Sequence, residues 1–355
     1  MVLLSNMRST FLKKIPQWDP KPVVLSTRIR LARNLADQPF PGWAREAQKR
    51  SVLSQCEMAL SKLPEFAKGD LFRMGDLDKT DRLVLVEKHL ISKELVDTTK
   101  YAAVCVSACQ DYAVMINEED HLRIQALGND LKFLPTWKKL TALDDAIEAR
   151  LSFAFSSEWG YLTACPTNLG TGMRASAMMH LPGLVLADLI DPVIRSLNAM
   201  NIMVRGLFGE GSDAKGSFFQ ISNQQTLGES EETILERLQH LLGKLLEHEL
   251  YAREKVIHEQ PHKVLDKISR AYGVLTNGCY TSADESMNLL SLIRLGIDYG
   301  MFPEVQRKKI DRLFTEVQPA HIELKMSSAK SSDQRDAFRA TFLRKEFANF
   351  PKPSV

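Results

Sequence analysis

The sequence predicts a mixed α/β domain followed by an all-helical domain. From residue 23 to about 219, short segments rich in β-branched and apolar residues show partial alternation, and helical stretches lie between them. Beyond Pro261, the apolar residues recur at helical spacing. With 355 residues and 44% hydrophobic content, the chain is long and apolar enough to bury the cores of two such domains.

The first domain is predicted to span residues 23–258. Before it, several prolines punctuate an N-terminal tail, 1–22, which is expected to run extended over the surface. Ser230 precedes two glutamates and a series of leucines at helical spacing, so a long amphipathic helix is expected to start there and close the domain. The remaining elements expected are helices at 43–63 and 138–155 and strands within 81–91, 101–127, 201–209 and 217–223.

The second domain is predicted to span residues 262–350. Ser282 and Glu285 have the spacing of a capping box, and Pro303 is typical of a helix start. Together with the apolar spacing, these signals predict four helices, at 262–277, 282–296, 304–316 and 332–347.

The composition excludes several classes of protein. Lysine and arginine number 46 against 44 aspartates and glutamates, so no overall charge favours direct binding of nucleic acid or a membrane surface. The order of apolar residues and lysines at the start is wrong for a signal peptide, and no stretch approaches the ~20 apolar residues of a membrane span. Five cysteines, without paired metal-type spacing beyond Cys105 and Cys109, fit a reducing compartment. A cytoplasmic location is therefore expected.

The sequence lacks the common nucleotide-binding motifs but carries arginines in unusual contexts. There is no P-loop, no glycine-rich dinucleotide motif and no protein-kinase motif set. A single arginine beside an apolar strand is more often part of a surface salt bridge. Arg28 and Arg30, however, are two residues apart and would share one side of a strand, as binding to a polyanion requires. The arginines in such contexts are Arg28, Arg30, Arg123, Arg174 and Arg205.

A cysteine loop and two carboxylates accompany these arginines. Cys165 begins the segment CPTNLGT, a tight turn rich in N–H donors that can stabilise a thiolate, although a lone cysteine is more often a small buried hydrophobe. Glu119 and Glu210 lie near the arginines in sequence. A guanidinium acceptor would need such carboxylates, because its pKa is above about 12 and a proton must leave before it reacts. For Glu118, Glu119 and Asp120, the alternative is an acidic turn in solvent.

Four segments resemble the signature motifs of the phosphagen (guanidino) kinases, the creatine and arginine kinase family. They are STRIRLAR, NEEDHLR, CPTNLGT and the RG-x-x-GE motif, in the family's order. The resemblance implies an α+β fold: a phosphagen-kinase-like catalytic domain with an antiparallel β-sheet flanked by helices, followed by the helical domain. It also implies an ATP:guanido phosphotransferase that uses ATP and Mg²⁺, with the metal held by nucleotide and water and no dedicated protein ligands.

The resemblance also assigns roles to single residues. Glu119 and Glu210 would hold the guanidinium and act as the base, Cys165 would contact the reactive nitrogen, and His89 would lie near the adenine or ribose. The nucleotide-binding residues implied are Ser26, Thr27, Arg28, Ile29, Arg30, His89, Arg123, Arg174, Ala175, Ser176, Ala177, Met178, Arg205, Gly206, Leu207, Phe208, Gly209 and Glu210.

Two departures point to one branch of that family. Only 25 residues precede Ser26, where the small-molecule kinases carry a helical domain that closes over a free amino acid, and a helical region follows Pro261. Both features are similar to the bacterial McsB-type protein-arginine kinases. The resemblance implies protein substrates, among them misfolded proteins and a CtsR-like repressor, a McsA-like activator, degradation of marked proteins by a ClpC–ClpP protease, a role in the stress response, and a homodimer through the helical domain.

The C-terminal segment RDAFRA resembles that branch's phosphoarginine pocket, which serves allosteric activation. The residues implied are Arg335, Asp336, Arg339 and Ala340. Arg335 and Arg339 are four apart on a helix, where like charges repel unless an anion lies between them; the alternative is a solvated helix face. Two other functions stay open at this point, a kinase for free arginine and a non-catalytic adaptor that keeps the fold.

Overall fold

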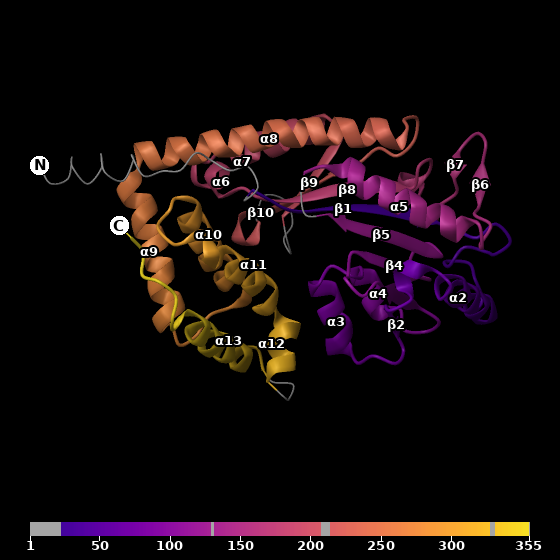
Figure 1. The fold of residues 1–355 in the computed structure, drawn as a ribbon, viewed down its shortest axis with the longest axis horizontal. Helices are drawn as coiled ribbons and strands as arrows, with labels where there is room; N and C mark the ends of the chain where they lie inside the picture. Colours follow the sequence, from indigo (N-terminus) through magenta and orange to yellow (C-terminus); the bar gives the residue numbers. More distant parts are fainter. Residues whose placement is uncertain (1–22, 129–130, 207–213, 327–330, 355) are drawn as a thin grey trace, which may run out of the picture.

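The computed structural model describes residues 23–128, 131–206, 214–326 and 331–354, and an eight-stranded sheet runs through it (Figure 1). Each neighbouring pair of strands is antiparallel, in the order β2-β3-β4-β5-β1-β8-β10-β9. The fold class expected from the sequence is thus confirmed. The strands are β1 (Val24–Arg33), β2 (Asp70–Arg73), β3 (Ala103–Val106), β4 (Tyr112–Ile116), β5 (Leu122–Gly128), β8 (Met173–His180), β9 (Ile202–Gly206) and β10 (Phe218–Asn223), and a separate hairpin pairs β6 (Phe155–Ser156) with β7 (Gly160–Tyr161).

One face of the sheet carries the main hydrophobic core. Alternate strand residues such as Ile29 and Leu31 of β1 are fully buried there, because successive side chains of a strand point to opposite faces. The helices that contribute to this core are α2 (Glu46–Leu60), α5 (Phe133–Glu148), α6 (Pro182–Leu186), α7 (Ile190–Ala199) and α8 (Glu231–Glu259).

The other face is covered at one end by two short helices, α3 (Lys79–Glu87) and α4 (Lys93–Asp97), over a smaller core with β3 and β4. The prediction of a strand within 81–91 was wrong. Asp78 caps α3 by accepting a hydrogen bond from the Asp81 N–H, and only the side of the helix with Val84 and Leu85 is buried. A short apolar run of this kind fits a helix or a strand equally well. Here the Asp78 cap stabilises the first turn of the helix.

The helix boundaries elsewhere follow the sequence signals with small differences. The predicted start of α8 is confirmed, because the Ser230 side chain accepts a hydrogen bond from the Thr233 N–H. The helix expected at 138–155 begins and ends earlier, at Phe133 and Glu148. Its start was misplaced because Pro135 lies in the first turn, where a missing N–H costs nothing.

The four helices predicted after Pro261 are present as α9 (Pro261–Asn277), α10 (Ala283–Asp298), α11 (Arg307–Glu316) and α13 (Ser332–Phe347). Ser282 accepts a hydrogen bond from the Glu285 N–H, which is one half of the predicted capping box. Pro303 precedes a 3-10 turn, Glu304–Gln306, that leads into α11. A further helix, α12 (Pro319–Lys325), was not predicted; with seven residues it is too short to show a periodic pattern. Among the described residues, no helix is long and apolar enough to cross a membrane.

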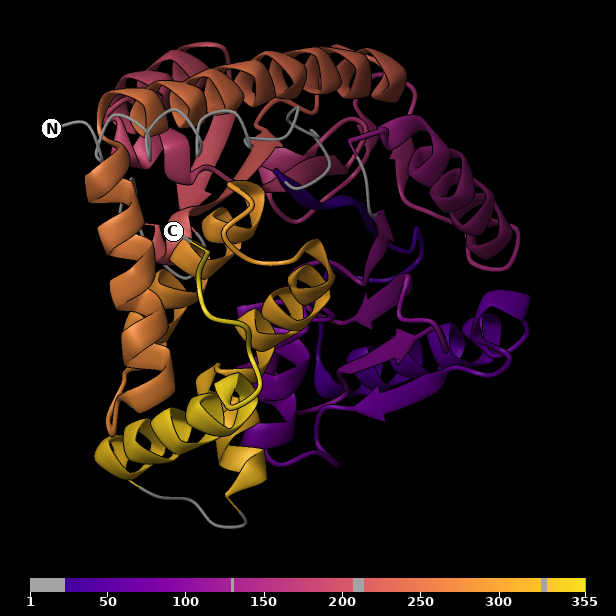
Figure 2. The ribbon, with the colours of Figure 1, turned by 60° about the vertical axis from the view of Figure 1, so that its left-hand side comes forward.

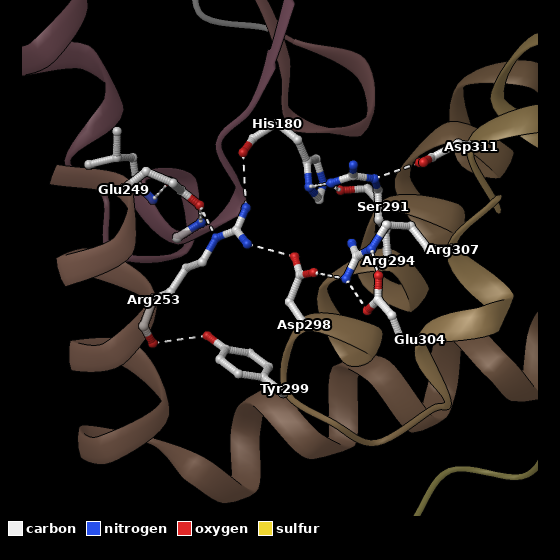
Figure 3. Close-up of polar contacts among 12 residues, drawn as sticks. His180, Glu249, Arg253, Ser291, Arg294, Asp298, Tyr299, Glu304, Arg307 and Asp311 are labelled. Carbon is white, nitrogen blue, oxygen red and sulfur yellow. Dashed lines mark hydrogen bonds and ion pairs between the residues drawn. The ribbon is translucent and has the colours of Figure 1, made fainter. Parts of the chain in front are cut away.

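The helical region packs on the same face of the sheet as α3 and α4. Met178 of β8 and Phe218 of β10 contact its core. The Phe218 ring also packs against the ring of His180, which belongs to the buried polar network drawn in Figure 3. At its other end α12 lies against α3, where Glu87 accepts hydrogen bonds from the N–H groups of Ala320 and His321 (Figure 2). The helical region therefore contacts the sheet region at two separate places on this face.

Candidate active site

Five arginines from four strands lie on one face of the sheet. Arg28 and Arg30 of β1 are two residues apart and point to the same side. Arg174 of β8 is directly opposite Arg30, and residues opposite each other in an antiparallel pair share a face. The register of β5 on β1 places Arg123 on this side, and the register of β9 on β10 and of β10 on β8 places Arg205 there. We call this surface the arginine face.

The arginines are close enough to disfavour one another's charge. Burial, then the charges of Arg174 and Arg123, lowers the pKa of Arg28 to about 10. The pKa of Arg30 falls well below its usual value, through burial first and then through Arg28 and its other neighbours. The Nε atoms of Arg30 and Arg174 are buried and have no hydrogen-bond partner among the described residues. Buried cations without acceptors are costly, and a bound polyanion would remove that cost. The arrangement fits a triphosphate.

The acidic turn after β4 supplies the carboxylates nearest to these arginines. Glu118 lies 2.6 Å from Arg123 and its side chain is 1% exposed, whereas Glu119 lies 3.1 Å from Arg123 and is 45% exposed. Burial, opposed by Arg123, raises the pKa of Glu119. Since Glu118 and Asp120 are both buried, the alternative of an acidic turn in solvent is wrong for these two residues.

Asp120 connects this turn to the cysteine loop. Its Oδ1 accepts hydrogen bonds from the Ala164 N–H at 2.7 Å and from Asn34 Nδ2 at 2.6 Å. Glu119 and Cys165 are the chain neighbours of Asp120 and Ala164, so the acidic turn and the cysteine loop lie next to each other. No local pattern in the sequence singles out Asn34, and the sequence predicts Asp120 only as part of an acidic turn. Their roles depend on a contact between segments 44 residues apart.

The Thr226 side chain bonds to the main chain of the cysteine loop. The Cys165 Sγ is half-buried, 3.0 Å from the Thr167 hydroxyl. The Thr226 hydroxyl lies 2.9 Å from the Thr167 carbonyl oxygen and 2.8 Å from that of Leu169. Gly170 has a φ of +101°, and a Cβ there would be 2.5 Å from the Thr226 carbonyl oxygen, so only glycine fits. Thr226 was not predicted, because nothing in its local sequence shows this contact.

His89 follows α3 and lies beside Arg28. Its φ is +59°, and burial, then the charge of Arg28, lowers the pKa of its imidazole to about 4. The Gln125 side chain, on the same face of the sheet as Arg30, donates a hydrogen bond to the His89 carbonyl oxygen at 2.9 Å. His89 is therefore uncharged at pH 7, which suits contact with a neutral ring.

Replacement of His89 by asparagine tests this burial. Asparagine tolerates the positive φ. Below pH 6.5 the unfolded wild-type chain binds a proton at His89 that the folded chain excludes until about pH 4. As the pH is lowered from 6.5 towards 4, the wild-type free energy of unfolding is therefore expected to fall, relative to that of the variant, by up to about 1.4 kcal/mol per pH unit. Urea unfolding from pH 7 to pH 5 measures it, with the exposed His240→Asn as control. A pH-independent difference would contradict the assignment.

Several predicted residues do not face the arginines, and others lie outside the described chain. The side chains of Thr27, Ile29, Ala175 and Ala177 point into the opposite core, because they alternate with Arg28, Arg30 and Ser176 along their strands. Ser26, Ser176 and Met178 share the arginine face, and Gly206 ends β9. The segment with Leu207, Phe208, Gly209 and Glu210 lies outside the described residues.

The residues of the predicted phosphoarginine pocket lie on α13 in the helical region. Arg339 is buried, donating to the carbonyl oxygens of Val317 at 2.7 Å and Thr281 at 3.0 Å and to the carboxylate of Asp336. Arg335 lies 3.9 Å from Glu323. Ala340 is buried. The alternative of a solvated helix face is therefore wrong for Arg339.

Comparisons with known proteins agree with this geometry. The family model of the ATP:guanido phosphotransferase C-terminal catalytic domain matches residues 51–252, and that of the protein-arginine kinase McsB C-terminal domain matches 261–355. The chain is 41% identical over 325 residues to a protein-arginine kinase of Symbiobacterium thermophilum, covering 91% of this chain and 92% of the relative. It is 39% identical over 332 residues to one of Pelotomaculum thermopropionicum, covering 93% of each.

A solved structure extends the likeness to the fold. The duplicated taurocyamine kinase from Schistosoma mansoni, with bound transition state analog components, superposes with a TM-score of 0.57 at 28% identity. The match covers 66% of this chain and 34% of that one, so it spans about a third of the duplicated kinase. The arginine face, the cysteine loop and both family models lead to one conclusion. The chain belongs to the ATP:guanido phosphotransferase family, in its protein-arginine kinase branch.

Proposed function

We propose that the protein transfers the γ-phosphate of ATP to the guanidinium of arginine side chains in other proteins. The observation that carries the proposal is the hydrogen bond from the Ala164 N–H to Asp120, because it joins the turn that carries Glu119 to the loop that carries Cys165. Arg123, bound to Glu119, links this pair to the arginine face. The relatives named protein-arginine kinase match nearly the whole chain, which supports arginine as the acceptor.

The proposed roles follow from charge. Arg28, Arg30, Arg174 and Arg205 hold and align the phosphates, and planar guanidinium groups do this in a fixed geometry. A nitrogen of the target arginine forms the new bond to the γ-phosphorus while the bond from that phosphorus to the bridging oxygen breaks, and ADP leaves.

The proton of the attacking nitrogen passes to a carboxylate in this scheme. Glu119 fits that role because its raised pKa makes it a better base than an ordinary glutamate. We also propose Glu210 for this role, from the family motif. Cys165 contacts the reactive nitrogen on its other side.

Mg²⁺ is part of the proposal through the family alone. Among the described residues no group of three or more histidine, cysteine, aspartate or glutamate side chains could hold a metal ion. In this proposal the ion is held chiefly by phosphate oxygens and water, as the family resemblance implies, and it neutralises developing negative charge there.

We further propose two units: a catalytic unit, 23–258, and a helical unit, 262–350, that mediates a homodimer. The match of residues 261–355 to the McsB C-terminal domain supports a regulatory role for the second unit, with Arg335, Asp336, Arg339 and Ala340 as an allosteric phosphoarginine site.

In this proposal the protein works in the cytoplasm during stress. It marks misfolded proteins and a CtsR-like repressor for a ClpC–ClpP protease, with a McsA-like activator.

The acceptor is tested by mass spectrometry without acid, because phosphoramidate bonds are acid-labile. An unfolded, arginine-rich protein incubated with Mg-ATP and the full-length chain is expected to carry phosphate on arginine. Glu119→Gln is expected to lower the rate by about 10²–10⁴-fold, the usual contribution of a general base. Glu94→Gln, an exposed neighbour, is the matched control and keeps the wild-type rate. Phosphate only on serine or threonine, or equal turnover of free arginine, would overturn the proposal.

A further inference from the structure

An open pocket of about 370 Å³ lies between the β6–β7 hairpin and the N-terminal end of α8. In Figure 1 the hairpin projects at the end of the molecule remote from the helical region. Phe155 and Trp159 form its outer wall and are 59% and 46% exposed, and Leu227 opposite them is 40% exposed. Such a concentration of solvent-exposed apolar side chains in a hollow is typical of a binding surface. No function described above uses it.

The charge of this pocket is opposite to that of the arginine face. Glu158, Glu229 and Glu231 line it, and the described lining residues include no lysine or arginine. Glu229 forms an ion pair with Arg237 outside the pocket, while Glu158 has no partner for its carboxylate among the described residues. A surface that joins free carboxylates to aromatic side chains is complementary to cationic and apolar side chains.

The pocket and the cysteine loop share a wall. Gly170 and Thr171 line the pocket, and Gly170 accepts a hydrogen bond from the Tyr161 N–H at 2.8 Å. Thr226, which also lines the pocket, holds the other side of that loop at Thr167 and Leu169. Gly170 is five residues after Cys165, so the two are less than about 18 Å apart. An extended peptide of about five residues covers that distance.

Two rings of this pocket, those of Tyr161 and Phe155, already pack on fixed neighbours. The Tyr161 ring stacks on the Arg33 guanidinium at 3.4 Å, and the Phe155 ring meets its face edge-on at 5.3 Å. Arg33 is itself fixed by Asp144 at 2.8 Å, with both side chains buried. A preformed wall lowers the entropy cost of binding a flexible chain.

We propose that this pocket binds the substrate polypeptide beside its target arginine, and that it selects flanking segments with lysine, arginine and apolar side chains. The inference rests on the proposed function, because the target arginine must enter at Cys165. It goes beyond that function by assigning a sequence preference to a surface outside the reaction centre. Acidic flanks are disfavoured by Glu158 and Glu231.

Two peptides that differ only in their flanks test the preference. Each carries one arginine, flanked by lysine and leucine in one peptide and by glutamate and serine in the other. The wild-type chain is expected to favour the basic peptide by on the order of tenfold in kcat/KM, the effect of one well-buried contact. Trp159→Ala and Glu158→Lys are expected to bring this ratio to within about threefold of one. Because the ratio is taken within one preparation, partial misfolding does not change it.

A matched control and a binding measurement complete the test. Glu247→Lys adds the same charge on α8, sixteen residues from Glu231 and outside the pocket, and is expected to keep the wild-type ratio. Fluorescence anisotropy of the basic peptide with norleucine in place of arginine measures binding without phosphorylation. The proposed role of the pocket is overturned if Trp159→Ala and Glu158→Lys bind this peptide as tightly as wild type and keep its preference for the basic peptide. It is also overturned if wild type does not prefer the basic peptide. Absence of arginine phosphorylation in every peptide would instead overturn the proposed function, and the binding result still decides the pocket.

Discussion

Replacement of Arg30 by methionine is expected to lower kcat/KM for ATP by about 10²–10³-fold, the usual loss when one donor to a developing anion is removed. The folded protein is expected to be at least as stable as wild type. Arg30 is half-buried among other cations, and its buried Nε has no partner among the described residues. A methionine of similar length removes the buried charge and keeps the packing. Stability and activity are thus expected to change in opposite directions.

Thermal unfolding with and without ATP separates the two effects. Wild type is expected to gain stability with ATP, since a ligand that binds only the folded state raises the unfolding temperature. Arg30→Met is expected to start from an equal or higher temperature and to gain little from ATP. Arg150→Met is the matched control, because Arg150 is exposed just after the end of α5, and among the described residues its side chain bonds only to the Ala146 carbonyl oxygen. Activity of Arg30→Met within threefold of wild type, or a lower unfolding temperature without ATP, would show that the arginine face is not an anion site.

The sequence predicted the arginine face in part. Two residues of separation were enough to place Arg28 and Arg30 on one side, because the period of a strand is local. No local signal could place Arg174 opposite Arg30, since that pairing joins segments more than a hundred residues apart. Arg205 joins the same face only through two further pairings, of β9 with β10 and of β10 with β8. The family motifs identified these arginines in the sequence. Only the register of the paired strands shows that their side chains share one face of the sheet.

The residues that sequence reasoning missed act through long-range contacts. Asp120 and Thr226 hold the cysteine loop by hydrogen bonds to its main-chain groups. Every residue type carries such groups, so the sequence pattern does not show which ones are bonded. Thr27 and Ala175 were included because whole segments were carried over, although the alternation of a strand turns them into the core. The four helices after Pro261 were predicted more reliably, because helix periodicity and capping lie within a few neighbouring residues.

A buried network of charges joins the sheet region to the helical region (Figure 3). Arg253 of α8 lies at its centre and donates to Glu249 at 2.5 Å, to Asp298 of α10 at 2.6 Å and to the His180 carbonyl oxygen at 3.0 Å. The other Glu249 contacts are the N–H groups of Gly183 and Leu184 at 2.8 and 2.9 Å. The side chains of Arg253, Glu249 and Asp298 are 1%, 0% and 2% exposed. One guanidinium therefore balances two buried carboxylates from different helices.

Replacement of Arg253 by methionine is expected to lower the free energy of unfolding by about 3–5 kcal/mol, the usual cost of leaving a buried charge without its partner. The loss arises because Glu249 loses its ion pair with Arg253, while Asp298 keeps Arg307 at 2.6 Å. Burial already raises the pKa of Glu249 against the lowering effect of Arg253. Without Arg253 the carboxylate is expected to take up a proton, so the variant is expected to lose most stability at high pH.

Guanidinium chloride unfolding at pH 6 and pH 8 measures this loss. Arg270→Met is the matched control: it also breaks an i,i+4 pair, with Asp266, but the side chains are 78% and 62% exposed, so a change below about 1 kcal/mol is expected. Adding Glu249→Gln to Arg253→Met removes the unpaired charge and is expected to restore part of the stability and abolish the pH dependence. If Arg253→Met costs no more than Arg270→Met, the network does not hold the two regions together, and the apolar contacts of Met178 and Phe218 and the contact of α12 with Glu87 must do so.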